Sequence, residues 1–179
     1  MKQGFLCLLL CLLFTACKNE KDNSGTTQTE PVATTPPPAE FADAKYVQSG
    51  KDGLAKLVSG DIDGWSASWA DNIVWVRNNG DSIAGKEALL KYWKDRRGNA
   101  IDSLAFSNEV WLPVKVNQSQ GTEATGVWLL AWYKVYARYK PGGKSMTQWM
   151  HMDYHYDAND KVDRIIQYQD SAPIAAAMK

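Results

Sequence analysis

The sequence predicts an α+β fold in which helices come first and a meander of long antiparallel strands follows. From residue 46 to residue 69, apolar residues recur at three- and four-residue steps, the spacing of one helix face. After residue 105 the pattern changes to long runs rich in Val, Trp and Tyr that are separated by turn sequences, which is typical of strands. Helices followed by consecutive strands is an α+β order.

The helical half begins with a helix predicted over residues 46–58. Gly60 suits the position after a helix C-terminus, and Asp61 can cap a second helix that carries Trp65 and Trp69 on one face. A short strand over residues 73–77 and a turn over 78–81 follow. A third helix is then predicted over residues 85–96.

The second half is predicted to be strand over residues 106–116, 126–139, 146–156 and 162–169. Turn sequences at residues 141–143 and 158–160 join the last three strands as hairpins. A curved sheet wrapped around three helices buries its concave face and leaves a cavity at its open end. Eight Trp and eight Tyr suggest that this cavity, or an exposed face, is rich in aromatic rings.

The chain begins with the features of a bacterial lipoprotein signal peptide over residues 1–16. Lys2 precedes an apolar run over residues 5–14, which is shorter than the roughly 20 residues that a membrane-spanning helix needs. The run ends at a stretch that resembles a lipobox, although Leu is usual where Phe14 stands. We therefore expect Cys17 to be the acylated first residue of the mature protein. An ordinary secretory peptide cut elsewhere is the alternative.

Residues 17–40 are predicted to form a disordered linker, because they are polar and rich in Thr and Pro. The charged cluster over residues 18–22 resembles the surface signals of some Bacteroidetes lipoproteins. The expected location is the cell envelope, with the outer membrane, on its periplasmic or surface side, favoured over the inner membrane. The globular domain is predicted over residues 41–172, with a short tail over 173–179.

Charge and cysteine content exclude several classes of protein. The sequence has 20 basic and 20 acidic residues, whereas nucleic-acid binding is driven by a basic excess. Cys7 and Cys11 lie inside the leader, so the mature domain has neither a disulfide framework nor a cysteine metal site. We expect no cofactor.

Four short motifs, taken in order, resemble the pattern of the NTF2-like (SnoaL-like) superfamily. They are Gly60-Asp61-Ile62, Trp69-Ala70-Asp71-Asn72, Ile83-Ala84-Gly85-Lys86-Glu87, and Lys161-Val162 with Tyr168-Gln169-Asp170. The resemblance spans residues 43–171 and implies a cone-shaped domain in which three N-terminal helices pack in a curved antiparallel sheet. That superfamily contains steroid isomerases, dehydratases, polyketide cyclases and non-catalytic binders, so the fold alone does not define an activity.

The steroid-isomerase machinery is missing at the matching positions. The resemblance places the general base at Arg77, the inward acid at Met152 and the oxyanion-donating Tyr near Gly53. An Arg side chain, whose pKa exceeds about 12, cannot abstract a proton at neutral pH. Pocket aromatics of that family fall on Trp69 and Trp93.

These positions define a predicted ligand pocket. Its expected ligand-binding residues share an inward position, and they are Trp69, Arg77, Trp93, Tyr133 and Met152. A buried Arg77 ringed by Trp would suit an anionic head group. The alternative is that Arg77 lies at the strand end in water.

His151, Asp153 and His155 share one face of a predicted strand. Residues two apart on a strand lie about 7 Å apart, so His151 and Asp153 are candidates for acid–base catalysis. This hypothesis requires both side chains to point inward. The alternative is that they are polar residues on the other face, while Met150, Met152, Tyr154 and Tyr156 point inward. No third metal ligand is evident, and we expect no metal.

The residues that alternate with the inward-facing ones along the predicted strands form an aromatic outer face. If Lys134 and Arg138 face outward, the same face carries Trp128, Trp132, Tyr136 and Trp149, and Trp111 can complete the patch. Exposed aromatic area of this size indicates an interface, so a homodimer is expected. A bulge would instead turn these rings into the cavity.

Three hypotheses for the function follow. The first is a membrane-anchored domain that binds a small, largely apolar or amphipathic molecule in an aromatic pocket without catalysis. The second is an enzyme of the cyclase, dehydratase or isomerase kind that uses His151 and Asp153. The third is an envelope module that binds another protein.

Overall fold

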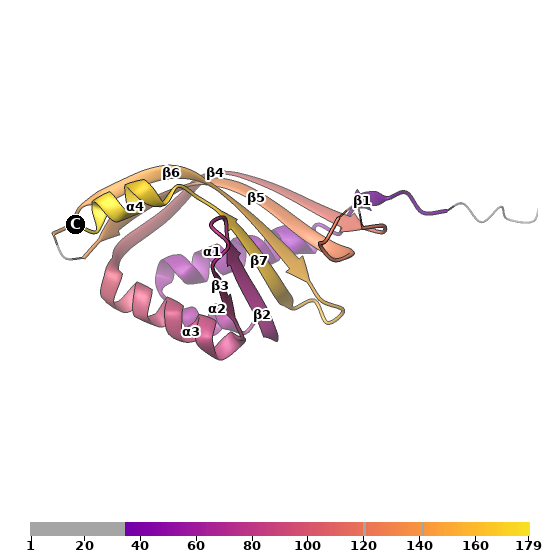
Figure 1. The fold of residues 1–179 in the computed structure, drawn as a ribbon, viewed down its shortest axis with the longest axis horizontal. Helices are drawn as coiled ribbons and strands as arrows, with labels where there is room; N and C mark the ends of the chain where they lie inside the picture. The colour runs from indigo at the N-terminus through magenta and orange to yellow at the C-terminus, as the bar shows by residue number, and fades with distance from the viewer. Residues whose placement is uncertain (1–34, 120, 141) are drawn as a thin grey trace, which may run out of the picture. The chain divides into compact units, whose positions relative to one another are not determined.

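The computed structural model describes residues 35–119, 121–140 and 142–179, which belong to one compact unit, Thr35–Lys179. Its elements follow the predicted α+β order (Figure 1). The helices are α1 (Lys45–Ser59), α2 (Ile62–Ser66), α3 (Lys86–Asp95), the π-helical turn η1 (Arg96–Ala100) and α4 (Ser171–Ala177). The strands are β1 (Ala39–Phe41), β2 (Trp69–Arg77), β3 (Ser82–Ala84), β4 (Ile101–Val116), β5 (Gly126–Tyr139), β6 (Ser145–Tyr156) and β7 (Val162–Tyr168). The predicted leader and the Cys17 anchor lie outside the described residues.

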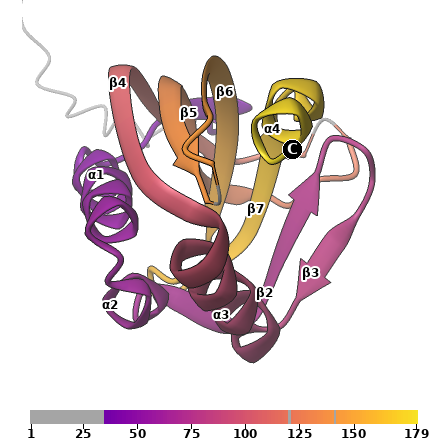
Figure 2. The ribbon, with the colours of Figure 1, turned by 90° about the vertical axis from the view of Figure 1, so that its left-hand side faces the viewer.

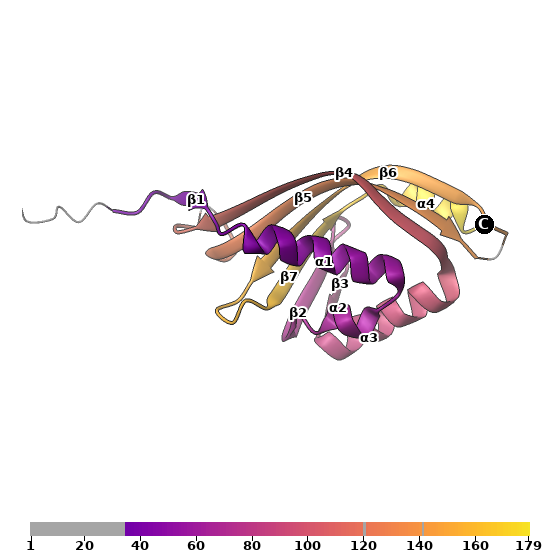
Figure 3. The ribbon, with the colours of Figure 1, turned by 180° about the vertical axis from the view of Figure 1, so that it is seen from behind.

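All seven strands form one sheet in the order β1-β4-β5-β6-β7-β2-β3. Strands β4 to β7 are antiparallel neighbours, whereas β2 pairs in parallel with β7. The sheet arches from β4 to β3, and α1, α2 and α3 close the open side of the arch (Figures 2 and 3). We call the side of the sheet that is turned toward these three helices the inner face and the opposite side the outer face.

The helices follow local signals. Gly60 ends α1 in the left-handed region, with φ of 82°, and the Asp61 carboxylate accepts a hydrogen bond from the Gly64 amide to cap α2. Gly50 lies where α1 crosses the sheet, and a Cβ there would come within 2.6 Å of Trp111 and 2.7 Å of Leu129. This close approach explains a glycine inside a helix, where it ordinarily costs stability.

The structure differs from the predicted elements at several places, since strands β1 and β3 were not predicted. Trp69 begins β2 instead of continuing α2, β4 starts at Ile101 instead of residue 106, and residues 171–177 form α4 where a short tail was expected. A periodic apolar pattern fits helix and strand equally well over a few residues, which accounts for Trp69. Helix α4 has its own cap, because the Asp170 carboxylate accepts a hydrogen bond from the Ala172 amide.

A bulge in β4 corrects the expected direction of Trp111. The register shifts between Ser107 and Val110, and Asn108 has φ of 54°. A bulge inserts one residue and reverses the alternation of side chains beyond it. Trp111 therefore faces inward against Gly50 and does not belong to the outer aromatic patch.

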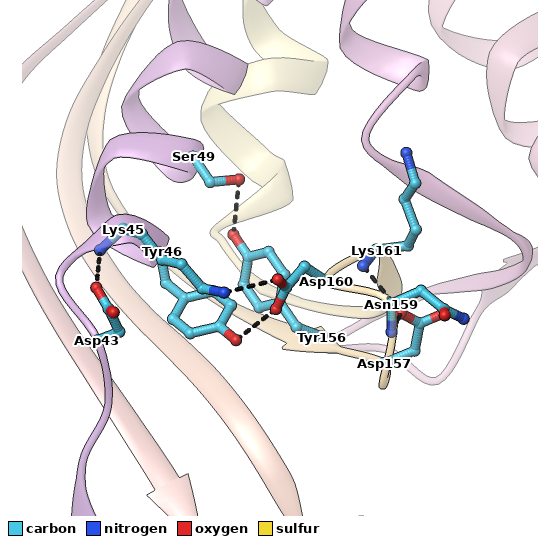
Figure 4. Close-up of polar contacts among 9 residues, drawn as sticks. All are labelled: Asp43, Lys45, Tyr46, Ser49, Tyr156, Asp157, Asn159, Asp160 and Lys161. Carbon is cyan, nitrogen blue, oxygen red and sulfur yellow. Dashed lines mark hydrogen bonds and ion pairs between the residues drawn. The ribbon is translucent and has the colours of Figure 1, made fainter.

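The turn between β6 and β7 is joined to the start of α1 by hydrogen bonds and a ring contact (Figure 4). Asp160 accepts hydrogen bonds from the Lys45 ammonium and the Tyr46 hydroxyl, each at 2.6 Å. The Tyr46 ring also contacts the Tyr156 ring at 4.6 Å between centroids, and the Tyr156 hydroxyl donates to Ser49. The contacts join residues that are more than 100 positions apart in the sequence.

Candidate functional site

An inner cavity of about 60 Å³ lies between the helices and the inner face of the sheet. Most of its wall is aromatic, aliphatic or thioether. The aromatic residues are Trp65, Trp75, Tyr92, Trp93, Phe106, Tyr133, Tyr139 and Tyr154, and the methionines are Met146, Met150 and Met152. The alternation of β5 and β6 produces this wall, since their odd and even residues, respectively, face the helices. Ile174 of α4 lines it as well.

Trp93 is the most unusual polar group of the wall. Its ring packs between Trp65 at 5.4 Å and Trp75 at 5.2 Å between centroids. Its Nε1 is buried and has no hydrogen-bond partner among the described residues, whereas Trp75 Nε1 donates to Gln167. A buried donor without a partner costs about 1–3 kcal/mol, and Trp93 is one of the residues that line the cavity.

The described residues supply the cavity with no group that can remove a proton at neutral pH. Its described lining includes no Asp, Glu, His, Lys or Cys, and its titratable residues are Arg96 and four tyrosines. The hydroxyls of Tyr133 and Tyr154 are hydrogen-bonded at 3.1 Å. Burial raises the pKa of both phenols well above the usual value. Both tyrosines therefore stay protonated and serve as hydrogen-bonding groups.

The five predicted ligand-binding residues separate into two groups. Trp93, Tyr133 and Met152 line the inner cavity. Trp69 does not, because it packs against Trp65 and borders a separate hollow of about 10 Å³. Arg77 is not in the lining either; it is half-buried, and its guanidinium lies over the Tyr92 ring at 5.1 Å.

His151 and Asp153 do not face the cavity. They lie on the outer face of β6, opposite Trp132 and Leu130 of β5, while Met152 and Tyr154 between and beside them are buried on the inner face. The catalytic hypothesis required inward side chains, so these two residues cannot act on a molecule in the inner cavity. His151 Nε2 is 2.9 Å from an Asp153 carboxylate oxygen.

Sequence reasoning missed Arg96, the one cationic residue that the described part of the chain contributes to the lining. It begins the π-helical turn η1 after α3 and lies over the Tyr139 ring at 5.8 Å. The i→i+5 pattern of such a turn has no sequence signature of its own. The inward parity of Tyr154, by contrast, was readable from the alternation of the strand.

The outer face carries most of the predicted aromatic patch. Trp149 and Tyr136 are 53% and 38% exposed, and Trp132 is half-buried. Trp128 is only 7% exposed, because the loop between β4 and β5 covers it and the Ala124 carbonyl accepts a hydrogen bond from its Nε1. The homodimer expected through this face stays a prediction.

Within the described ranges, no three His, Cys, Asp or Glu side chains gather closely enough to hold a metal ion. The helices of the same ranges are all too short or too polar to cross a membrane.

Comparison with solved structures identifies the fold. A candidate isomerase from Bacillus subtilis superposes with a TM-score of 0.58 at 15% identity, over 74% of this chain and 91% of that chain. A candidate polyketide cyclase from Xanthomonas campestris superposes with a TM-score of 0.58 at 14% identity, over 74% and 96%. An NTF2-like protein from Burkholderia xenovorans superposes with a TM-score of 0.54 at 18% identity, over 78% and 100%. The chain therefore has the NTF2-like fold that the motifs predicted. No protein-family model and no curated protein matches the sequence.

Proposed function

We propose that this domain binds a small, largely apolar molecule in the inner cavity and holds it without acid–base catalysis. The observation that carries the proposal is the unpartnered Nε1 of Trp93 in an aromatic wall. A ligand with a carbonyl or carboxylate oxygen would accept that hydrogen bond, and Arg96 favours a negative charge on it. The lack of a carboxylate or imidazole in the described lining argues against proton abstraction.

The volume of the cavity limits the size of the ligand that it can hold. The open volume of about 60 Å³ is smaller than the roughly 150 Å³ of an engineered cavity that binds benzene. A ring-sized ligand therefore needs side chains to move. Met146, Met150 and Met152 line the cavity, and methionine adapts readily because its side chain is unbranched and flexible.

An enzyme of the isomerase or cyclase kind is the alternative, since two of the three structural neighbours described above carry those names. Such an enzyme would need a general base that the described lining of this cavity does not contain. We also propose that Cys17 tethers the domain to a membrane of the cell envelope. This part rests on the lipobox-like stretch and the apolar run before it.

Thermal unfolding of the purified protein with benzoate, benzaldehyde and toluene tests the binding proposal. These probes share a ring and differ in the acceptor. We expect benzoate and benzaldehyde to raise Tm more than toluene. Trp93→Phe should remove most of that difference, because one hydrogen bond contributes about 0.5–1.5 kcal/mol.

The matched control is Trp149→Phe, which alters an exposed outer-face ring and should leave all three shifts unchanged. Trp93→Phe also shortens a buried ring that packs on Trp65 and Trp75, which lowers the Tm of the ligand-free protein, so each ligand-induced shift is measured from the ligand-free Tm of the same variant. Equal shifts by all three probes, or shifts that survive in Trp93→Phe, would contradict the proposal.

A further inference from the structure

A second and larger hollow lies on the outer face, away from the inner cavity. We call it the outer groove; it has a volume of about 630 Å³, and its floor includes Leu130, His151, Asp153, Ile166 and Tyr168. This volume falls within the roughly 300–1,000 Å³ of typical small-molecule sites. A shallower hollow of about 550 Å³, bordered by Trp132 and Trp149, continues from it and shares His151 and Tyr168.

One wall of the outer groove is formed by residues of the loop between β4 and β5, and three side chains of the outer face bind this loop. Trp128 Nε1 donates to the Ala124 carbonyl at 3.0 Å, and His155 Nε2 lies 3.0 Å from the Thr125 carbonyl. Arg164 contacts the Glu123 carboxylate through two nitrogens, at 2.8 and 3.0 Å. Residues 123–125 of this wall are therefore held against the outer face of the sheet by side-chain contacts.

The floor places one carboxylate among aliphatic side chains. Asp153 pairs across the sheet with Leu130 on one side and Ile166 on the other, and Leu112 and Val76 continue the same row. Its side chain is 15% exposed. Burial raises the pKa of Asp153, His151 acts in the opposite direction, and the nearby Glu123 adds to the increase. An apolar residue would pack better in this row, so folding does not explain the carboxylate.

The partners of Asp153 leave its charge incompletely compensated. His151 Nε2 is 2.9 Å from Asp153 Oδ1, and no other group among the described residues donates a hydrogen bond to Oδ1. His151 neutralises the carboxylate only when it is protonated. The other basic side chains of this region already have acidic partners, since Arg164 pairs with Glu123 and His155 with Asp163.

Aromatic rings flank this carboxylate. Trp132, His151 and Tyr168 stand in a row across β5, β6 and β7, with His151 stacked at 4.5 Å on Trp132 and at 5.5 Å on Tyr168. Tyr168 is 46% exposed. Electron-rich rings beside a carboxylate in an apolar hollow attract organic cations through both charge and cation–π contact.

We propose that the outer groove is a binding site for an amphipathic amine. The ammonium group of the ligand pairs with Asp153, and its apolar part covers Leu130 and Ile166. The site is independent of the inner cavity, because it lies on the opposite side of the sheet and shares no lining residue with it.

Isothermal titration of the purified protein with octylammonium, octanoate and octanol tests this site, because the three probes share a chain and differ in head group. Octylammonium should bind at least tenfold more tightly than octanoate. Asp153→Asn should weaken octylammonium binding at least tenfold. Asp102→Asn is the matched control, since it removes an exposed carboxylate that pairs with Arg138 at 3.7 Å, and it should leave the affinity unchanged.

Two further variants separate loss of binding from loss of folding and separate the outer groove from the inner cavity. Asp153→Leu completes the aliphatic row, so it should fold with a raised Tm and still lose octylammonium binding. Trp93→Phe should leave octylammonium binding intact, which separates this site from the inner cavity.

Octylammonium affinity that is unchanged in Asp153→Asn, or equal affinity for octanoate, would overturn the proposal. So would a stable dimer in sedimentation that Trp149→Lys dissociates and that does not bind octylammonium, because the face would then belong to a second copy.

Discussion

The Tyr46 hydroxyl donates a hydrogen bond to the Asp160 carboxylate at 2.6 Å, and this contact joins the first helix to the last hairpin (Figure 4). Asp160 has φ of 57°, a left-handed conformation that Asp and Asn tolerate better than most residues. The Lys45 ammonium, and then the Tyr46 hydroxyl, lower the pKa of Asp160. The ionised carboxylate is therefore favoured in the folded protein.

We predict that Asp160→Asn lowers the stability at pH 7 and weakens its dependence on acid pH. A carboxyl whose pKa is lower in the folded state contributes stability that is fully present above its unfolded pKa of about 3.9, and this contribution declines as the pH falls from that value through the lower folded pKa. Asparagine keeps the left-handed backbone and loses only the charge. Urea unfolding at pH 7 and pH 3 measures the effect, with Asp102→Asn as the control. An equal loss at both pH values would contradict the electrostatic explanation.

Gly50 supports a second prediction, on packing. The side chain of Ala at this position would meet Trp111 and Leu129 at less than the contact distance. Overpacking of this kind typically costs about 1–3 kcal/mol, although Ala is otherwise the better helix residue. Gly50→Ala should therefore lower the free energy of unfolding. Gly98→Ala, where no atom lies within 4 Å of the added Cβ, should not lower it; if both variants lose equal stability, the close approach is not the cause.

Strand alternation made much of the sheet predictable. The bounds of β5 agree with residues 126–139, and Met152, Tyr154 and Tyr156 face inward as the alternative interpretation of β6 required. Turn sequences fixed the ends of these strands, and the burial of one face fixed their parity.

Features that depend on tertiary packing were not predictable. Asn108 gives no sign in sequence that it reverses the parity of β4, which is why Trp111 was placed on the wrong face. The inner cavity takes Arg96 from a π-helical turn and Ile174 from α4. Neither contribution follows from a period of two or of 3.6 residues.

The predicted anchor gives a third prediction. Cys17→Ser should abolish incorporation of an alkyne-labelled palmitate and release the protein from the membrane fraction, because the thiol is the proposed acylation site. Cys11→Ser lies in the same leader and should leave labelling intact. Labelling of Cys17→Ser at the normal level would contradict the lipoprotein assignment.

The methionines of the inner cavity provide the last prediction, which connects stability with ligand binding. Met152 is 2% exposed and lines the cavity beside Tyr154. Met152→Ala should lower the free energy of unfolding by about 2–5 kcal/mol, since the truncation removes buried contacts and leaves a larger void. The same void should accept toluene, so toluene should raise the Tm of Met152→Ala more than that of the unmodified protein. Met178→Ala, which truncates a methionine that is 45% exposed, should change neither quantity. If toluene stabilises Met152→Ala no more than the unmodified protein, the hollow closes when the side chain is removed, and the cavity is then not a site that methionine movement can open.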